Sequence, residues 1–238
     1  MRDIVTIPLN EKVSLIISSD NSGGIGMKAE DLVKVSYETV AYYSFRVAAM
    51  ECIAGGGELI SVVVHNFCGN EPWEELVKGV QKGVKELGLS EVSVTGSTES
   101  NFSLKQSAVG IIVIGKKATD TVMEVSLSDS LKVAVIGMPL VGNEVVEHSE
   151  NVVPLALFQE ICRLKDVVVL PVGSKGIFYE LNQLFSNKVL EKGNLIMDID
   201  VFKSSGPSTC FIAVYPGGLE EKIKSASGNY FHSVHIEF

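Results

Sequence analysis

The chain has 238 residues, of which 46% are hydrophobic and 21% charged, and its formal net charge is −9 at pH 7. This composition is typical of an ordered globular protein and excludes an intrinsically disordered one. The negative charge, without a basic patch, argues against a nucleic-acid partner. No apolar run reaches the roughly 18 residues of a membrane span, and the first residues lack a secretory signal. We therefore expect a cytoplasmic protein with no membrane partner.

The cysteines show no metal-binding or redox spacing. A CxxC pair, which would indicate a zinc site or a redox motif, is absent from the sequence. Isolated cysteines usually behave as small hydrophobic residues. We predict buried or inert thiols at Cys52, Cys68, Cys162 and Cys210.

The first half of the chain interleaves strand-like and helical patterns. The clearer helix is 72–89, which has Pro72 near its start and an apolar residue at every third or fourth position. A second helical pattern, 37–57, stops at a run of three glycines. Strands are predicted at 13–19, 31–37, 59–65, 91–95 and 107–115.

The second half starts again after a polar connection near residues 118–130. The overall pattern predicts an α+β fold of two α/β halves, with domains at 1–120 and 121–238. In the second half the strands are predicted at 131–138, 166–172, 194–202 and 209–215, and the helices at 154–164 and 177–185.

A glycine-rich segment follows the first strand, in the sequence SSDNSGGIGMK. Asp20 precedes Gly23, Gly24 and Gly26, and Lys28 ends the segment. Glycines let backbone N–H groups approach a phosphate closely, and lysine adds a point charge. The spacing is not that of a Walker A loop. A plain loop with an exposed lysine is an equally good interpretation of this segment alone.

Two isolated acids stand out. Glu51 lies in the apolar stretch VAAMECIA, where its helical neighbours offer no ionic partner. We expect a metal ion or a distant lysine beside it, unless it lies on a solvent-facing stripe. Glu99 is the single acid in the loop-like stretch SVTGSTESNF, whose oxygens suit a hard cation, although a polar turn has the same composition.

A further turn, Gly173-Ser174-Lys175-Gly176, separates a strand from a helical pattern. Ser174 could cap that helix, and the free N–H groups of a helix N-terminus bind anions. An ordinary strand-to-helix turn would look much the same.

The order of these segments resembles the superfamily of aminoimidazole-ribonucleotide synthetase, thiamine-monophosphate kinase and selenophosphate synthetase. Within it, the sequences ISSDNSGGIGMK, SFRVAAMECIAGG, VHNFCGNEPWEELVKGV, VTGSTESNF, PVGSKGI and KSSGPSTC look most like the α-ribazole kinase group of cobalamin salvage, also called α-ribazole-5′-phosphate synthase. The resemblance covers nearly the whole chain. It implies a homodimer whose N-terminal halves share a β-barrel, and the binding of ATP with Mg²⁺.

The resemblance also implies roles for single residues. Asp20, Glu51 and Glu99 would be the metal ligands, although relatives usually carry an acid at the position of Ser97 rather than Glu99. Lys28 would be catalytic through its charge on the phosphates. The cofactor-binding residues would be Gly23, Gly24, Gly26, Lys28, Thr95, Gly96, Thr98, Asn101, Gly173, Ser174, Lys175 and Gly176.

The implied reaction is transfer of a phosphoryl group from ATP to the 5′-hydroxyl of α-ribazole, a small-molecule substrate. Such transfer depends mainly on positioning and on neutralising phosphate charge. His65 is a candidate general base, with a structural histidine as the alternative. Lys175 and the segment 204–209 are further candidates for phosphate or substrate contact. The rival hypotheses are another ATP-dependent synthetase or kinase of the superfamily, and a non-catalytic nucleotide-binding regulator.

Overall fold

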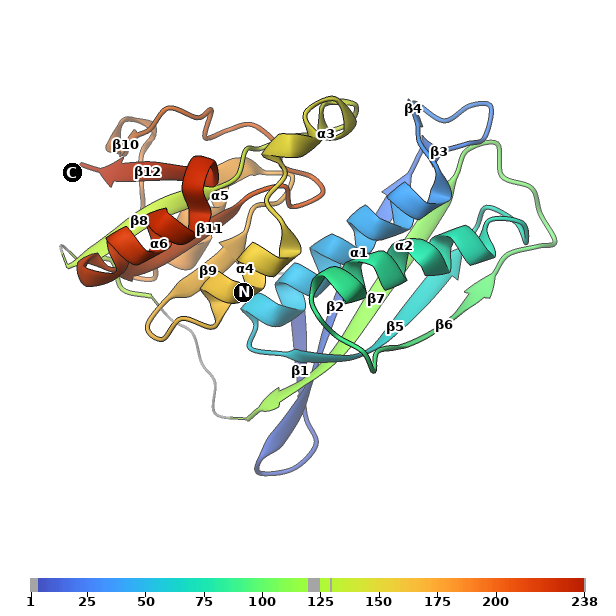
Figure 1. The fold of residues 1–238 in the computed structure, drawn as a ribbon, viewed down its shortest axis with the longest axis horizontal. Coiled ribbons are helices and arrows are strands. Elements are labelled where there is room, and N and C mark those ends of the chain that lie inside the picture. Colours follow the sequence, from blue (N-terminus) through green and yellow to red (C-terminus); the bar gives the residue numbers. More distant parts are fainter. Residues whose placement is uncertain (1–3, 120–124, 129, 238) are drawn as a thin grey trace. The chain divides into compact units, whose positions relative to one another are not determined.

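The computed structural model describes residues 4–119, 125–128 and 130–237, and the chain divides near residue 121 into two compact units (Figure 1). Both units combine helices with a five-stranded sheet, which confirms the predicted α+β class. No helix in the described part of the chain has the length and apolar character needed to cross a bilayer.

The N-terminal unit has a five-stranded sheet with strand order β1-β2-β7-β5-β6 and a small parallel pair, β3 with β4. The pairings of the five-stranded sheet are antiparallel except for β5 with β6. The elements are β1 (Ile4–Pro8), β2 (Val13–Gly23), β3 (Ile25–Gly26), β4 (Val33–Lys34), α1 (Tyr37–Ala54), β5 (Glu58–Asn66), α2 (Trp73–Glu86), β6 (Ser93–Thr98) and β7 (Ala108–Ala118).

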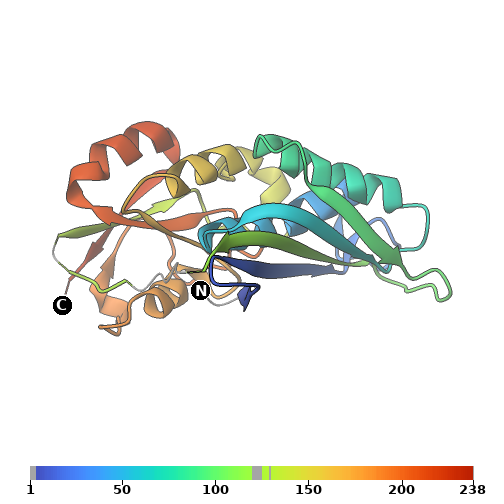
Figure 2. The same ribbon diagram turned by 90° about the horizontal axis from the view of Figure 1, so that it is seen from below.

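Helices α1 and α2 pack together over one face of this sheet (Figures 1 and 2). Ser36 caps α1 by accepting a hydrogen bond from the Thr39 amide. The helices approach closely at Gly79 and Gly83, where an added Cβ would collide with the Glu38 carbonyl oxygen and the Phe45 ring. The apolar stripe predicted for α2 therefore packs against α1.

The opposite face of the sheet carries many apolar side chains but no helix of the described N-terminal unit (Figure 2). Val5 and Ile7 at the β1 edge are 59% and 42% exposed. The strand register places further apolar side chains on the same face, namely Leu15, Ile17, Val63, Ile112 and Ile114. The sheet is open, and no closed barrel forms within the described residues of this unit.

The C-terminal unit is a second five-stranded sheet with order β10-β12-β8-β11-β9, and all its pairings are antiparallel. Helices α5 and α4 lie on opposite faces of this sheet (Figure 2). Ile177 and Leu181 of α5 pack on one face, and Phe158 of α4 meets Phe211 on the other. The elements are β8 (Leu131–Ile136), α3 (Glu144–Glu147), α4 (Leu155–Cys162), β9 (Val168–Pro171), α5 (Gly176–Leu184), β10 (Leu195–Ile196), β11 (Phe211–Pro216), α6 (Glu220–Ser227) and β12 (Phe231–Ile236).

Several predicted elements differ from the structure. The strand expected at 31–37 is reduced to β4, because Ser36 already caps α1. The strand expected at 194–202 is reduced to β10. The stretch from Gly96 to Thr98, expected as a loop after the strand 91–95, belongs to β6 and pairs with β5. Strands β1 and β12 and helix α6 were not predicted.

Candidate functional site

The glycine-rich segment is a tight turn that leads from β2 into β3. Gly24 has φ +70° and Gly26 has φ +151°, in a region that favours glycine. A Cβ at Gly26 would lie 2.5 Å from the Ser107 hydroxyl oxygen. These two glycines are therefore required by the backbone conformation and by contact with the segment before β7, whereas a Cβ at Gly23 would meet nothing within 4 Å.

A buried carboxylate ties this turn to the segment before β7. Asp31 Oδ2 accepts hydrogen bonds from the Lys28 amide at 2.8 Å and from the Ser107 hydroxyl at 2.7 Å, and Oδ1 accepts from the Ser107 amide at 2.7 Å. Burial would raise the pKa of Asp31, but the hydrogen bonds from Ser107 and from the Lys28 amide outweigh it, so the pKa lies below its usual value. Asp31 is thus a charged acceptor at neutral pH.

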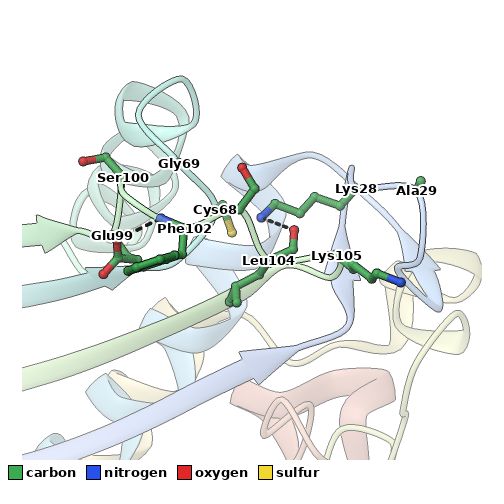
Figure 3. A pocket seen from close by; sticks show the side chains of 10 residues that line it. Lys28, Ala29, Cys68, Gly69, Glu99, Ser100, Phe102, Leu104 and Lys105 are labelled. Atoms are coloured by element: carbon green, nitrogen blue, oxygen red, sulfur yellow. Dashed lines mark hydrogen bonds between the residues drawn. The ribbon is translucent and has the colours of Figure 1, made fainter.

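Lys28 reaches across a cavity of about 360 Å³ (Figure 3). Its Nζ donates to the Leu104 carbonyl oxygen at 2.9 Å and lies 3.4 Å from the carbonyl oxygen of Phe67. An ammonium group has three donors, so two carbonyl oxygens leave one N–H for a ligand. The cavity is lined by Lys28, Ala29, Cys68, Gly69, Glu99, Ser100, Phe102, Ser103, Leu104 and Lys105.

Glu99 lies in the same cavity, directly after β6. Its Oε1 accepts hydrogen bonds from the amides of Asn101 at 2.7 Å and Phe102 at 3.3 Å (Figure 3). Its own amide donates to the Asn66 carbonyl oxygen at 2.8 Å. The carboxylate therefore holds the turn that forms one cavity wall, and the structure brings together two of the predicted site residues, Lys28 and Glu99.

Asp20 does not line this cavity. It is a half-buried residue of β2 on the face that packs against α1, where its carboxylate accepts a hydrogen bond from Ser44. Burial is the main cause that raises the pKa of Asp20 to about 7, although hydrogen bonds from Ser44 and the Asn21 backbone lower it. An acid with such a pKa is partly protonated at neutral pH, and a cation beside it would favour the charged form.

Glu51 lies further along α1 than Ser44, the residue that hydrogen-bonds to Asp20. It is buried, at 6% exposure, and follows Ser44 by seven residues, which is about 10 Å along a helix. Among the described residues, no three His, Cys, Asp or Glu side chains lie close enough to hold a metal ion. Asp20, Glu51 and Glu99 therefore do not form one preformed metal site. A metal ion that also binds phosphate oxygens needs fewer protein carboxylates as ligands.

The remaining predicted residues of the N-terminal unit have mixed positions. His65 is exposed on the sheet face opposite α1 and α2, where it pairs in register with Gly110, and it is not part of the cavity lining. Gly96 allows β6 to approach β5, since a Cβ there would collide with the Val64 carbonyl oxygen. Thr95 and Thr98 lie beside Gly96 in β6, and Asn101 follows in the cavity-wall turn.

The predicted turn in the C-terminal unit, residues 173–176, joins β9 to α5. Helix α5 begins at Gly176 after Lys175, and no side chain caps it, so the expected cap by Ser174 is wrong. Gly176 has φ +79°, and a Cβ there would lie 2.9 Å from the Lys203 carbonyl oxygen. Close packing with residues 201–203 explains this glycine, while Gly173 and the exposed Ser174 stay candidates for ligand contact.

The other candidates in this unit make internal contacts. Lys175 Nζ lies 4.3 Å from the centroid of the Tyr179 ring and 3.3 Å from its hydroxyl oxygen. Within the segment 204–209, the buried hydroxyl oxygens of Ser205 and Thr209 are 2.8 Å apart, and Thr209 donates to the Met138 carbonyl oxygen at 2.7 Å. These hydroxyls stabilise the loop, and their contact with a phosphate stays a prediction.

Sequence reasoning missed several residues of the cavity and its support. The position of Asp31, three residues after Lys28, fits an Asp that caps a turn and could have been noticed. Ser107 lies 76 residues from Asp31 in sequence, so no local pattern reveals the pair. Cys68, expected to be buried or inert, is half-buried in the cavity lining.

No protein-family model matches the sequence, and no curated protein matches it. Several solved structures are similar to this chain in fold. Thermotoga maritima PurL complexed with AMPPCP has a TM-score of 0.64 and 12% identity; the match covers 98% of this chain and 42% of PurL, so the chain spans less than half of that protein. AaThiL complexed with AMPPCP and TMP has a TM-score of 0.62 and 12% identity, with coverage of 100% and 85%. HypE in a HypE–HypF complex has a TM-score of 0.60 and 14% identity, with coverage of 98% and 87%. The chain therefore has the fold of ThiL and HypE and of a part of PurL.

Proposed function

We propose that the chain is an ATP- and Mg²⁺-dependent small-molecule kinase that phosphorylates the 5′-hydroxyl of α-ribazole. The observation that carries this proposal is the cavity, which brings Lys28 and Glu99 together in a fold whose similar structures include complexes with AMPPCP and ATP. Its volume is within the range of small-molecule sites. The choice of α-ribazole comes from the sequence resemblance.

The donors around the cavity suit a nucleotide phosphate. In this proposal the third N–H of Lys28 donates a hydrogen bond to a phosphate oxygen, and the hydroxyls of Ser100 and Ser103 are further donors to the phosphates. Glu99 binds Mg²⁺ through Oε2 in this proposal, because Oε1 accepts from backbone amides. Mg²⁺ supplies charge neutralisation between the acidic protein and the phosphates, and few protein carboxylates are needed when phosphates complete its shell.

Asp20 is the second proposed metal ligand, at a position outside the cavity lining, since its carboxylate is partly desolvated and a cation beside it would favour the charged form. Glu51 stays a weaker candidate because it lies further along α1. In the reaction, the 5′-oxygen bonds to the γ-phosphorus, the bond to the β-bridging oxygen of ATP breaks, and the hydroxyl proton leaves to a base or to water. His65 as that base stays a prediction.

We also propose that two copies of the chain associate through the uncovered sheet face. Its apolar side chains include Ile17 of β2, which is paired with Ile114 of β7, and Ile112, which lies two residues from Ile114 on the same face of β7. An exposed sheet face of this composition is more stable when it is covered. A second copy is the occupant implied by the sequence resemblance, and the pairing would place His65 inside the interface.

The test of the proposed function is to incubate the pure protein with ATP, Mg²⁺ and α-ribazole, and to measure ADP and the mass of the ribazole. We expect ADP in equal amount to a product heavier by one phosphoryl group, and loss of both in Lys28→Met. Binding of ATP without any ribazole phosphate would contradict the substrate, and ATP binding without ADP from any acceptor would support the regulator instead.

A further inference from the structure

We propose that Asp31 is a positioning residue that fixes Lys28 against the wall of the cavity, an inference that rests on the proposed function. Asp31 does not line the cavity, and the resemblance assigned it no role. It acts on the ligand only through the position of Lys28.

Lys28 is held at both of its ends. Its amide donates to Asp31 Oδ2 at 2.8 Å, and its carbonyl oxygen accepts from the Asp31 amide at 3.1 Å. At the other end, its Nζ donates to the Leu104 carbonyl oxygen at 2.9 Å. A lysine side chain has four rotatable bonds, so anchoring both ends removes most of its freedom before a ligand arrives.

The second wall is attached to the same carboxylate. Ser107 donates to Asp31 through its amide and its hydroxyl, both at 2.7 Å. Three residues before Ser107, the carbonyl oxygen of Leu104 accepts a hydrogen bond from the Lys28 ammonium group. The contacts therefore close a ring that runs from Lys28 to Asp31, to Ser107, back along the chain to Leu104, and to Lys28 again. Breaking the ring at Asp31 removes the link through which one carboxylate fixes both walls.

The ring depends on a carboxylate and not on a generic polar group. Asp31 is 7% exposed and accepts from three donors, which are the Lys28 amide, the Ser107 amide and the Ser107 hydroxyl. An asparagine has one acceptor oxygen, so its NH₂ group would face one of the two backbone N–H donors. Asp31→Asn therefore keeps the side-chain shape and breaks at least one link of the ring.

The test is a double-mutant cycle with Asp31→Asn and Lys28→Met, in which calorimetry measures binding of Mg²⁺-AMPPCP. We expect Asp31→Asn alone to weaken binding roughly tenfold, as for loss of a hydrogen bond to a charged group. In the Lys28→Met background, adding Asp31→Asn should change binding by less than about twofold. A matched exposed carboxylate, Glu11→Gln, should leave binding unchanged. Equal losses in both backgrounds, or wild-type binding by Asp31→Asn, would overturn the positioning role.

A second measurement separates this inference from the proposed function. Hydrogen exchange in the free protein should become faster in residues 23–32 and 104–108 of Asp31→Asn, with α1 and α2 unchanged. If the wild type binds no nucleotide, the proposed function fails and the exchange result alone decides whether the ring exists; unchanged exchange in both segments refutes it. If Asp31→Asn fails to fold, Ser107→Ala replaces it, because this variant removes only the hydroxyl link. We expect a smaller increase of the exchange rate in the same two segments.

Discussion

Replacing Asp20 by asparagine should stabilise the metal-free protein above about pH 6. The carboxylate is half-buried between β2 and α1, and burial raises its pKa from 3.8 to about 7. Folding therefore makes the Asp20 carboxylate harder to ionise than it is in the unfolded chain. Asparagine keeps the shape and can still accept a hydrogen bond from Ser44, but it does not titrate.

The sign and size follow from proton linkage. Between pH 4 and 7 the unfolded chain has lost the Asp20 proton and the folded chain keeps it, so the free energy of unfolding falls as the pH rises. The fall is about 1.4 kcal/mol for each pH unit well below pH 7 and becomes smaller near pH 7, where the folded carboxylate is half ionised, so it amounts to about 2 kcal/mol from pH 5 to pH 7. For a chain of this length, that corresponds to roughly 4–8 °C in melting temperature.

The assay is thermal unfolding of wild type and Asp20→Asn with a chelator at pH 5, 6, 7 and 8. The melting temperature of the variant minus that of the wild type should rise steadily from pH 5 to pH 7 and level off near pH 8. Glu11→Gln, at an exposed carboxylate, should show no such trend. A difference that stays constant across these pH values would refute the raised pKa of Asp20.

Three further predictions concern packing and assembly. Ile112→Asp should convert a wild-type dimer into a monomer in sedimentation velocity, because it places a charge on the uncovered sheet face; a dimer that survives would exclude this face. Gly96→Ala should destabilise the protein by about 3 kcal/mol in urea unfolding, since its Cβ collides with β5, whereas Gly23→Ala should change little; equal effects would contradict the packing. Phe158→Ala should cost about 4 kcal/mol in the same assay, because the ring is fully buried against Phe211; a loss below about 1 kcal/mol would contradict this.

The sequence predicted best those elements whose apolar pattern is strong. Helix α2 has a buried residue at Leu76, Val80 and Val84, and this spacing is visible without the structure. The strand β7 alternates buried and half-buried residues in the same way. Strand β1 was missed because it is an edge strand that is exposed along most of its length. It therefore has no buried face that would produce an alternating apolar pattern in the sequence.

The site was predicted less completely, for a physical reason. The sequence selected Lys28 and Glu99, which share a cavity, and also Asp20 and Glu51, which do not line it. The glycines near Lys28 were interpreted as ligand contacts, while Gly26 is required by Ser107, a contact distant in sequence. Local patterns report the conformation that a segment prefers, and they do not report which distant segment packs against it.

The most direct test of the account is calorimetric titration of the wild type and of Lys28→Met with Mg²⁺-AMPPCP at pH 8. We expect one saturable site in the wild type and binding weaker by at least roughly tenfold in the variant, because the proposal gives Lys28 a charge-assisted hydrogen bond to the phosphates. Equal binding by both proteins would place the nucleotide elsewhere, and no binding by the wild type would contradict the proposed function itself.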